Sequence, residues 1–449
     1  MITINSLGLW FSAITSILFW LTALVVLIRI IRVAMGKNDL KERAIPCPWK
    51  EAGQFIEYLT SEKKGFHINI KIIIFGVLAR IITLLLAQMF LQNNLQDASF
   101  LGVFNSFNRW DAGHYLRLAE HGYGLPYYRP EPSHIFVVFF PLYPWLVRLV
   151  SVATRSYLAA AYVVSFGSYL AGLCYLYHLV KHDFSERTAW WAIVLISIFP
   201  FSFFFGAPHT ESLFLLTTTM TLYYIRKHNW FLAGISGALA SATRMVGIAL
   251  IFAAAVEFVM HYKLFTLMKK GKWEEFFSLI GKKGLFILLM LVGVLVYLNV
   301  NYHTTGDSFR FMYYQRTHWS QGFLYFGQTM RMQFDNLPTY IGDISQNSGL
   351  YIHLPNILSF AFVVWAILYG SLKRHNASHL VYAMGYVFVS FSLSWLLSGG
   401  RYASALVPAF IFLADYVERK PHRRLIVPVI FILLFLPILR MYVLGGWVM

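Results

Sequence analysis

Residues 8–30 read GLWFSAITSILFWLTALVVLIRI and carry one ionisable side chain, Arg29. A helix needs roughly 20 consecutive apolar residues to cross a bilayer, so this stretch predicts a membrane-spanning helix. Similar runs recur along the chain, which is 58% hydrophobic and 13% charged. Soluble proteins carry roughly 25% charged residues. The sequence therefore predicts an all-α polytopic membrane protein with a single membrane domain over residues 1–449.

About twelve apolar runs predict transmembrane helices. They lie at residues 8–30, 68–91, 156–180, 188–206, 210–225, 229–243, 245–262, 284–302, 353–371, 378–397, 402–417 and 425–444. The first run has no basic segment before it and no small-residue cleavage pattern after it, so it predicts a retained span and not a signal peptide. Residues 1–67 therefore comprise an extra N-terminal span with a cytoplasmic basic loop, and residues 68–449 form the core.

Basic residues predict how the chain is oriented in the membrane. The net charge of +17 would suggest a nucleic-acid partner in a soluble protein, but here the positive-inside rule accounts for it. With the N-terminus outside, every lysine falls on the cytoplasmic side. We expect a multi-pass cell-membrane protein that contacts membrane lipids and binds no nucleic acid. Residues 135–152 contain Pro141, Pro144 and Arg148, so they predict an interfacial helix within a long first outer loop.

The predicted outer face carries the polar residues that suggest function. Two long loops, 93–155 and 303–352, lie there, and long loops with their own polar residues are often functional. Ionisable residues also lie at the outer ends of the spans, where they are costly unless they face a cavity or a partner. We therefore expect one shared polar site. Its candidates are His209, Glu211, Arg244, Asp307 and Arg401.

The densest polar stretch of the first loop is Asn108-Arg109-Trp110-Asp111. Asp111 precedes a helix-like stretch, so it is either a helix cap or a chemical group. No nucleotide is available outside the cell, so an activated group must arrive attached to something membrane-soluble, such as a polyprenyl phosphate sugar. Asp111 would then serve as the general base for an acceptor hydroxyl, and Arg244 or Arg401 would bind the phosphate. His209, Glu211 and Asp111 lack the spacing of a metal motif, so we expect neither a metal nor a cofactor.

These residues resemble the PIG-V-like (GPI mannosyltransferase 2-like) family of GT-C integral membrane glycosyltransferases. The similar segments, in order, are Arg109–Tyr115 with Ala119 and Gly122-Tyr123, Phe140–Pro144, Thr210–Phe214, Ala242–Arg244 with Gly247, Gly306-Asp307 with Phe311 and Gln315–Trp319, and Arg401-Tyr402 with Pro408. The sequence departs from the family at Met245-Val246, where Pro and Asn are usual, and at Ser308, where Pro is usual. The extra N-terminal span indicates a bacterial member.

The resemblance implies a GT-C fold and a metal-independent, inverting transferase. It implies that a sugar, mannose on family grounds, moves from a polyprenyl-phosphate donor to a hydroxyl at the extracytoplasmic face. The expected acceptor is a glycolipid, an envelope polymer or a protein. Asp111 is the implied catalytic carboxylate. The alternative function is a transporter or flippase of lipid-linked sugars, which would carry ionisable residues near mid-bilayer. A catalytically inactive scaffold is a third reading, which the intact Asp111 region disfavours.

Several site candidates have an ordinary structural role as an alternative. Arg109 binds phosphate or pairs with Asp111, and His114 is either a member of the site or an orienting residue. Glu211 belongs to the site or favours a helix dipole. Asp307 belongs to the site or forms a turn beside Gly306. Tyr402, next to Arg401, completes the predicted substrate-binding residues.

Overall fold

The structure, a computed structural model, describes residues 4–34, 54–124, 134–337, 349–446 and 448. Its α-helices are α1 (Ile4–Ala34), α2 (Gln54–Asn93), α3 (Phe100–Ser106), α4 (Asp111–His121), α5 (Leu142–Thr154), α6 (Tyr157–Asp183), α7 (Glu186–Ile198), α8 (Glu211–Arg226), α9 (Trp230–Thr243), α10 (Leu250–His261), α11 (Leu264–Lys269), α12 (Trp273–Lys282), α13 (Val292–Thr305), α14 (Arg310–His318), α15 (Phe326–Asn336), α16 (Leu354–Leu372), α17 (Ala377–Phe391), α18 (Gly399–Ser404), α19 (Val407–Glu418) and α20 (Arg423–Val443). Shorter helical turns are η1 (Ile135–Val138), η2 (Ser202–Phe204), η3 (Met245–Ala249), η4 (Gly284–Leu291) and the π-helical η6 (Gly349–His353).

The all-α prediction is confirmed. Within the described ranges, extended pairing is confined to one isolated bridge between Phe323 and Leu393. Each of the predicted apolar runs contains a helix. Six helical segments of the described chain are long and apolar enough to cross a membrane: Leu7–Val33, His67–Asn93, Tyr157–Asp183, Trp273–Thr305, Gly349–Leu372 and Arg423–Val443. The other runs form shorter helices, so the predicted number of crossings stays a prediction.

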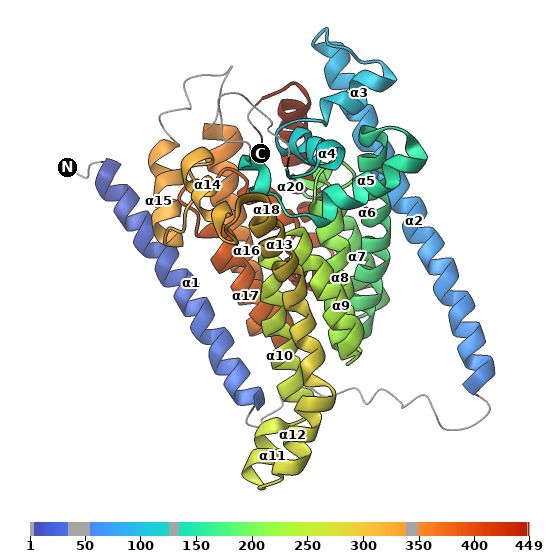
Figure 1. Cartoon of the computed structure of the whole chain (residues 1–449), viewed down its shortest axis with the longest axis vertical. Helices are drawn as coiled ribbons and strands as arrows, with labels where there is room; N and C mark the ends of the chain where they lie inside the picture. The colour runs from blue at the N-terminus through green and yellow to red at the C-terminus, as the bar shows by residue number, and fades with distance from the viewer. Residues whose placement is uncertain (1–3, 35–53, 125–133, 338–348, 447, 449) are drawn as a thin grey trace.

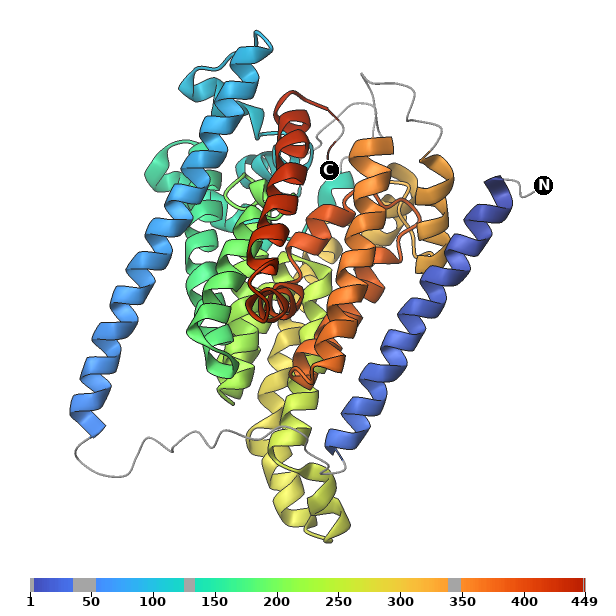
Figure 2. The ribbon, with the colours of Figure 1, turned by 180° about the vertical axis from the view of Figure 1, so that it is seen from behind.

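The helices form a bundle with two different ends (Figure 1). Helix α1 lies on one flank against α15, α16 and α17, and α2 lies on the opposite flank against α6 and α20 (Figures 1 and 2). Helices α11 and α12 extend from one end, and α3 and α4 lie at the other. The basic loop predicted within residues 1–67 falls largely on 35–53, outside the described residues, as do 125–133 and 338–348 of the two outer loops.

Polar side chains fix where several helices begin. The hydroxyl oxygens of Ser99, Ser156 and Ser185 accept a backbone N–H from the first turns of α3, α6 and α7. Asn229 and Asn376 do the same for α9 and α17. Such caps satisfy N–H groups that have no partner within the helix. The short segments between the apolar runs therefore contain the residues that cap the following helices.

Glycines allow α9 to pack deep in the bundle. A Cβ atom on Gly237 would lie 2.5 Å from Met290 of η4, and one on Gly293 of α13 would lie 2.1 Å from the backbone oxygen of Ala238. Both distances are far below van der Waals contact, so only glycine permits this approach. Close helix approach through small residues is typical of membrane proteins. The short helix α9 is therefore held against η4 and α13 by close backbone approach.

The run at 135–152, predicted to lie at the interface, forms η1 and α5. Helix α5 has 13 residues, so it is about 20 Å long, which is less than the roughly 30 Å of a bilayer core. Its outer side exposes Trp145, Leu149 and Val152. With α3 and α4 it makes the first predicted outer loop a helical subdomain that sits over the bundle (Figure 1).

The extra N-terminal helix is joined to the core by specific contacts. The indole N–H of Trp20 donates to the hydroxyl of Tyr325 at 2.9 Å, and the rings of Phe19 and Phe326 lie 4.3 Å apart. Near the other end, Arg29 donates to the carbonyl oxygens of Gly370 and Ser371, both at 3.2 Å. Helix α1 is therefore an integral part of the bundle's flank.

Charged residues join the helices at the end that carries α11 and α12. The guanidinium of Arg226 donates to both carboxylate oxygens of Asp183, at 3.0 and 2.7 Å, and also to Glu257. These residues link α6, α8 and α10 at the positions where the predicted cytoplasmic loops begin. Most candidate site residues lie at the opposite end of the bundle. The predicted cytoplasmic face and the predicted outer face are therefore at opposite ends of the structure.

Candidate functional site

Asp111 is placed by an unusual backbone conformation at the start of α4. Trp110 precedes the helix with a φ of +54° and makes no side-chain capping bond, and Asp111 is the first helical residue. The predicted alternative of Asp111 as the helix cap is therefore wrong. Its side chain instead points to a distant segment, where Oδ2 accepts a hydrogen bond from Nη1 of Arg401 at 2.7 Å. The first loop is thus joined to α18.

Glu211 is the second carboxylate of the site. It is the first residue of α8 and is fully buried. Its Oε1 accepts from Nη1 of Arg244 at 2.7 Å and from Nε of Arg401 at 2.5 Å. A buried carboxylate is stable only when it is paired and hydrogen-bonded. Glu211 therefore holds both arginines in place, which exceeds a simple helix-dipole role.

The two arginines also rest on aromatic rings. The guanidinium carbon of Arg244 lies 5.2 Å from the ring centre of Tyr402 and 5.8 Å from that of Phe214. That of Arg401 lies 5.1 Å from the ring centre of Phe204. Cations over aromatic faces within about 6 Å are favourably placed. The rings and Glu211 together fix the guanidinium groups before any substrate arrives.

Asp111 and Glu211 differ in how accessible they are. The side chain of Asp111 is 34% exposed, and that of Glu211 is 0% exposed. A general base must come within hydrogen-bond reach of the proton that it removes. Of the two carboxylates that share Arg401, only Asp111 meets this requirement in the structure.

The protonation of Asp111 follows from its surroundings. Burial alone would raise its pKa, but the charge and the hydrogen bond of Arg401 outweigh burial, so the pKa lies below its usual value. His209 and His114 lower it further. Asp111 is therefore an ionised carboxylate at neutral pH, which is the form that accepts a proton.

His209 lies in the loop that joins α7 to α8 and is held in a defined tautomer. The hydroxyl of Tyr442 donates to the carbonyl oxygen of Phe107 at 3.0 Å, so it accepts from Nε2 of His209, also at 3.0 Å. Burial, and next the charge of Arg401, lower the pKa of His209 to about 4. The imidazole is therefore neutral, and its buried Nδ1 is an acceptor without a partner among the described residues.

His114 lies on α4 one turn after Asp111. Its ring centre is 4.9 Å from that of Phe136 and 5.4 Å from that of Phe139. Burial lowers its pKa, and the charge of Asp111 opposes this only in part. Its buried Nδ1 also has no hydrogen-bond partner within the described chain. His114 thus lies beside the carboxylate on an aromatic surface.

Two of the predicted residues have described contacts outside the charged cluster. Arg109 donates to the carbonyl oxygens of Ser106, at 3.0 Å, and Val443, at 2.8 Å, and not to Asp111 as one alternative predicted, whereas its predicted role in phosphate binding stays a prediction. Asp307 is exposed, and its Oδ1 accepts the backbone N–H of Phe309 at 2.9 Å. This is the turn geometry that was predicted as its alternative role.

Buried polar atoms without a partner surround the cluster. In the part of the chain that the structure describes, they include Oε2 of Glu211, Nδ1 of His209 and Oδ1 of Asn108. Each of these atoms accepts hydrogen bonds, and unsatisfied buried acceptors are uncommon in native proteins. A ligand that supplies several hydrogen-bond donors would satisfy them.

Comparison with known proteins gives a weak structural similarity. No protein family and no curated protein matches the chain. ArnT from Cupriavidus metallidurans bound to undecaprenyl phosphate is 17% identical, with a TM-score of 0.47 over 79% of this chain and 62% of that one. The apo oligosaccharyltransferase of Archaeoglobus fulgidus is 13% identical, with a TM-score of 0.45 over 83% of this chain and 56% of that one. The chain thus spans about three fifths of the length of these proteins.

The sequence did not single out every residue that shapes the site. Tyr442 of α20 orients His209, and Tyr143 reaches the same loop through Ser165, whose hydroxyl donates to the carbonyl oxygen of His209 at 3.3 Å. Both tyrosines lie in apolar runs, where a tyrosine at the membrane interface and one in the core look alike. The aromatic-proline segment that contains Tyr143 was the one available signal.

Proposed function

We propose that this protein is a GT-C glycosyltransferase, similar to the PIG-V-like enzymes, that transfers a sugar from a polyprenyl-phosphate donor to an acceptor hydroxyl. The observation that supports this function is the Asp111–Arg401–Glu211–Arg244 chain of contacts. Its members come from four motif segments far apart in sequence. An accessible carboxylate and two fixed guanidinium groups meet at one end of a helical bundle, as the proposed chemistry requires.

Asp111 acts as the base in this reaction. Its carboxylate takes the proton of the acceptor hydroxyl as the acceptor oxygen bonds to the anomeric carbon of the sugar. The bond between that carbon and the phosphate oxygen breaks, and the polyprenyl phosphate leaves with the electron pair. Attack opposite the leaving group inverts the anomeric centre. General-base catalysis of this kind contributes roughly 10²- to 10⁴-fold to a rate.

Arg244 and Arg401 bind the phosphate of the donor. Among the described residues, the hydrogen bond of Arg244 is to Glu211 alone, which leaves further N–H groups for phosphate oxygens. Arginine presents planar donors that suit phosphate. When the donor phosphate also accepts hydrogen bonds from Arg401, the interaction between Arg401 and Asp111 weakens. The Asp111 carboxylate then becomes more basic. Donor binding would thus prepare the base.

The unpaired acceptors support a sugar as the transferred group. Sugar hydroxyls donate hydrogen bonds, and Glu211 Oε2, His209 Nδ1 and Asn108 Oδ1 are buried acceptors. Mannose is the sugar we propose, on the motif resemblance, in a bacterial member of the family. We also propose that this end of the bundle faces the extracytoplasmic side of the cell membrane, since the basic clusters lie at the other end.

A transporter of lipid-linked sugars would need ionisable groups along a path through the bilayer. Arg80, near the middle of the α2 span, is such a residue by position. It donates to the carbonyl oxygens of Ser197, Ser202 and Phe205 at 2.9, 2.5 and 3.0 Å. These bonds fix a loop, which favours the enzyme over the transporter.

The decisive experiment replaces the proposed base, Asp111, with asparagine, which has nearly the same shape but cannot act as a base. Purified Asp111→Asn protein would be assayed with a panel of polyprenyl-phosphate sugars and membrane-extract acceptors. We expect transfer by the unchanged protein and a loss of roughly 10²- to 10⁴-fold in the variant. The matched control is Glu120→Gln on the same helix, because Glu120 is exposed. Wild-type transfer by a folded Asp111→Asn protein would remove the proposed role.

The orientation has a separate test. Leu95 follows α2 and is 98% exposed, so Leu95→Cys would present a thiol at the end that carries Asp111. An impermeant maleimide added to whole cells should label it. Labelling only after the membrane is opened would place this end in the cytoplasm and exclude the proposed topology.

A further inference from the structure

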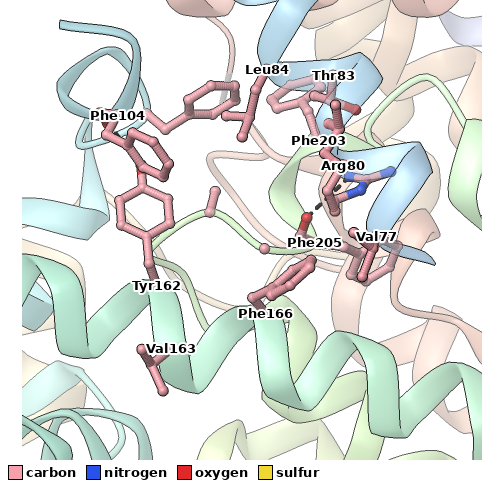
Figure 3. Close-up of a pocket in the computed structure, with 14 residues that line it drawn as sticks. Val77, Arg80, Thr83, Leu84, Phe104, Tyr162, Val163, Phe166, Phe203 and Phe205 are labelled. Carbon is pink, nitrogen blue, oxygen red and sulfur yellow. Dashed lines mark hydrogen bonds between the residues drawn. The ribbon is translucent and has the colours of Figure 1, made fainter. Parts of the chain in front are cut away.

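A cavity of about 340 Å³ lies between α2, α3, α6 and the loop before α8 (Figure 3). Six of the fourteen residues that line it are aromatic, and Figure 3 shows Phe104 above Tyr162 on one side and Arg80 beside Phe203 on the other. The rings of Phe104 and Tyr162 lie 4.7 Å apart, edge to face. Ligand pockets span roughly 300–1,000 Å³, so this one is large enough for part of a hydrocarbon chain.

The one charged residue that lines the cavity, Arg80, uses both terminal nitrogens of its guanidinium in hydrogen bonds, and only its Nε has no partner among the described residues. Arg80 donates to three backbone carbonyl oxygens and stacks over the ring of Tyr169, 4.9 Å away. Its positive charge is therefore committed to the loop at 197–205, and the rest of the wall is almost entirely apolar. A charged headgroup would have to compete with these carbonyls. The cavity suits the apolar part of a ligand.

The cavity opens toward the side of the bundle. Ile81 of α2 and Val163 of α6 line it and are 45% and 54% exposed. Both helices are long and apolar enough to cross a membrane. Exposed apolar side chains on such helices face lipid. A chain from the surrounding bilayer can therefore enter between Ile81 and Val163 without passing through water.

The inner wall of the cavity is also the rear wall of the candidate site. Phe107 and Phe203 line the cavity, and their rings lie 5.9 and 4.8 Å from that of Tyr442. Tyr442 in turn bonds to His209. Asp111 follows Phe107 by four residues in the first loop. The cavity thus adjoins the Asp111 and His209 side of the site, whereas Arg244 rests on Phe214 and Tyr402, which do not line it.

We propose that this cavity binds the hydrocarbon chain of a lipid acceptor, so that the acceptor is a membrane glycolipid. The proposal rests on the proposed function, because it uses Asp111 as the base. The hydroxyl to be glycosylated must lie next to the base, and the donor phosphate next to Arg244 and Arg401. The rings beneath these two arginines, Tyr402, Phe214 and Phe204, do not line the cavity. The cavity lies on the base's side. A chain held there would keep the lipid's head at the site while the donor approaches from the other side.

Photo-crosslinking tests the cavity without needing activity. The protein would be reconstituted in phosphatidylcholine vesicles with a glucosyl diacylglycerol that carries a diazirine on one acyl chain. We expect crosslinks to peptides that contain Leu84 and Phe104. Ile81→Trp should reduce this labelling roughly tenfold, the effect of excluding about two buried methylene groups. The matched control is Leu85→Trp on the same helix, since Leu85 is 58% exposed and does not line the cavity.

A second probe separates the acceptor from the donor. Polyprenyl phosphate with a diazirine at its distal end should label other peptides, and its labelling should be the same in both variants. Preferential labelling of the cavity by this probe would overturn the acceptor assignment. Equal labelling in the Ile81→Trp and Leu85→Trp proteins would overturn the cavity as a binding site. Val163→Trp, on α6, repeats the test if Ile81→Trp fails to fold.

The outcome is separable from the proposed function. If no polyprenyl-phosphate sugar is transferred but the cavity is labelled specifically, the function fails and the lipid site stands. If transfer occurs, the KM of the glycolipid should rise roughly tenfold in Ile81→Trp, with the KM of the donor unchanged. A rise in the donor's KM alone would contradict the proposal.

Discussion

Nη1 of Arg401 lies 2.7 Å from Oδ2 of Asp111, although the two residues are 290 positions apart in the chain. The same guanidinium donates to Glu211 through Nε. Arg401 therefore joins an accessible carboxylate to a buried one. This contact lowers the pKa of Asp111, the proposed base, and it attaches the first loop to the bundle beside the proposed phosphate site.

Lysine substitutions should separate the roles of the two arginines. Lysine keeps the charge but loses the planar fork. Arg244→Lys should raise the KM of the donor roughly ten- to a hundredfold, the value of a charge-assisted hydrogen bond of about 1.5–3 kcal/mol. Arg401→Lys should in addition lower the thermal stability, because Arg401 is buried between two carboxylates. Steady-state kinetics and thermal unfolding in detergent measure both effects. Equal loss of stability in the two variants would contradict this division.

The pH dependence of transfer should follow Asp111. Arg401 lowers the pKa of Asp111, so the base loses its charge only at a pH below the ordinary value of about 3.9. The stabilisation from this ion pair is likewise present above that ordinary value and is lost as the pH falls through the lowered pKa. The rate should be constant through neutral pH, since His209, with a pKa of about 4, does not titrate there.

Arg401→Gln provides the matching test for the pH profile. Without the guanidinium, burial dominates and the pKa of Asp111 rises. The acid limb of kcat/KM for the residual activity should then move to higher pH. An acid limb that stays in place would show that a group other than Asp111 controls the rate.

Tyr442→Phe should destabilise the site without removing a reacting group. The change leaves Nε2 of His209 and the carbonyl oxygen of Phe107 without their partner. Each unsatisfied buried group costs about 1–3 kcal/mol, so we expect a lower unfolding temperature and a smaller loss of activity than in Asp111→Asn. Tyr302→Phe is the control, because Tyr302 is 55% exposed. Unchanged unfolding in Tyr442→Phe would mean that water or a rearrangement replaces the hydroxyl.

A substitution of Asp307 tests whether this residue only forms a turn or belongs to the functional site. Asparagine retains the Oδ1 acceptor that binds the N–H of Phe309, so Asp307→Asn should change kcat/KM by no more than about twofold, as exposed substitutions usually do. Steady-state transfer with the active donor measures this. A loss of the size expected for Asp111→Asn would place Asp307 in the site, as the sequence predicts.

The helices and most of the charged cluster could be predicted from the sequence, and the reasons are physical. Apolar runs of membrane length leave the backbone no alternative to a helix. Ionisable residues at the ends of such runs need partners, so Glu211, Arg244 and Arg401 were predicted to meet, and they do. Asp111 was predicted with them, although its capping alternative proved wrong.

Other features depend on information that a single sequence does not contain. Arg109 meets the carbonyl of Val443, and no residue type marks a backbone acceptor in a distant helix. Tyr442 and Arg80 lie within apolar runs, where the pattern does not tell a lipid-facing position from a buried one. The cavity arises from the way α2, α3 and α6 approach one another, which is a property of tertiary packing.

Helix α20 supplies the hydroxyl of Tyr442 to His209 and the carbonyl of Val443 to Arg109. The ribosome makes this helix after every other element of the cluster. Until it inserts beside α2 and α7, His209 and Arg109 lack the partners that it supplies. A partly synthesised chain therefore contains every member of the Asp111–Arg401–Glu211–Arg244 contacts, but its His209 is not yet oriented. A chain shortened before α20 would leave Nε2 of His209 and the guanidinium of Arg109 without these partners.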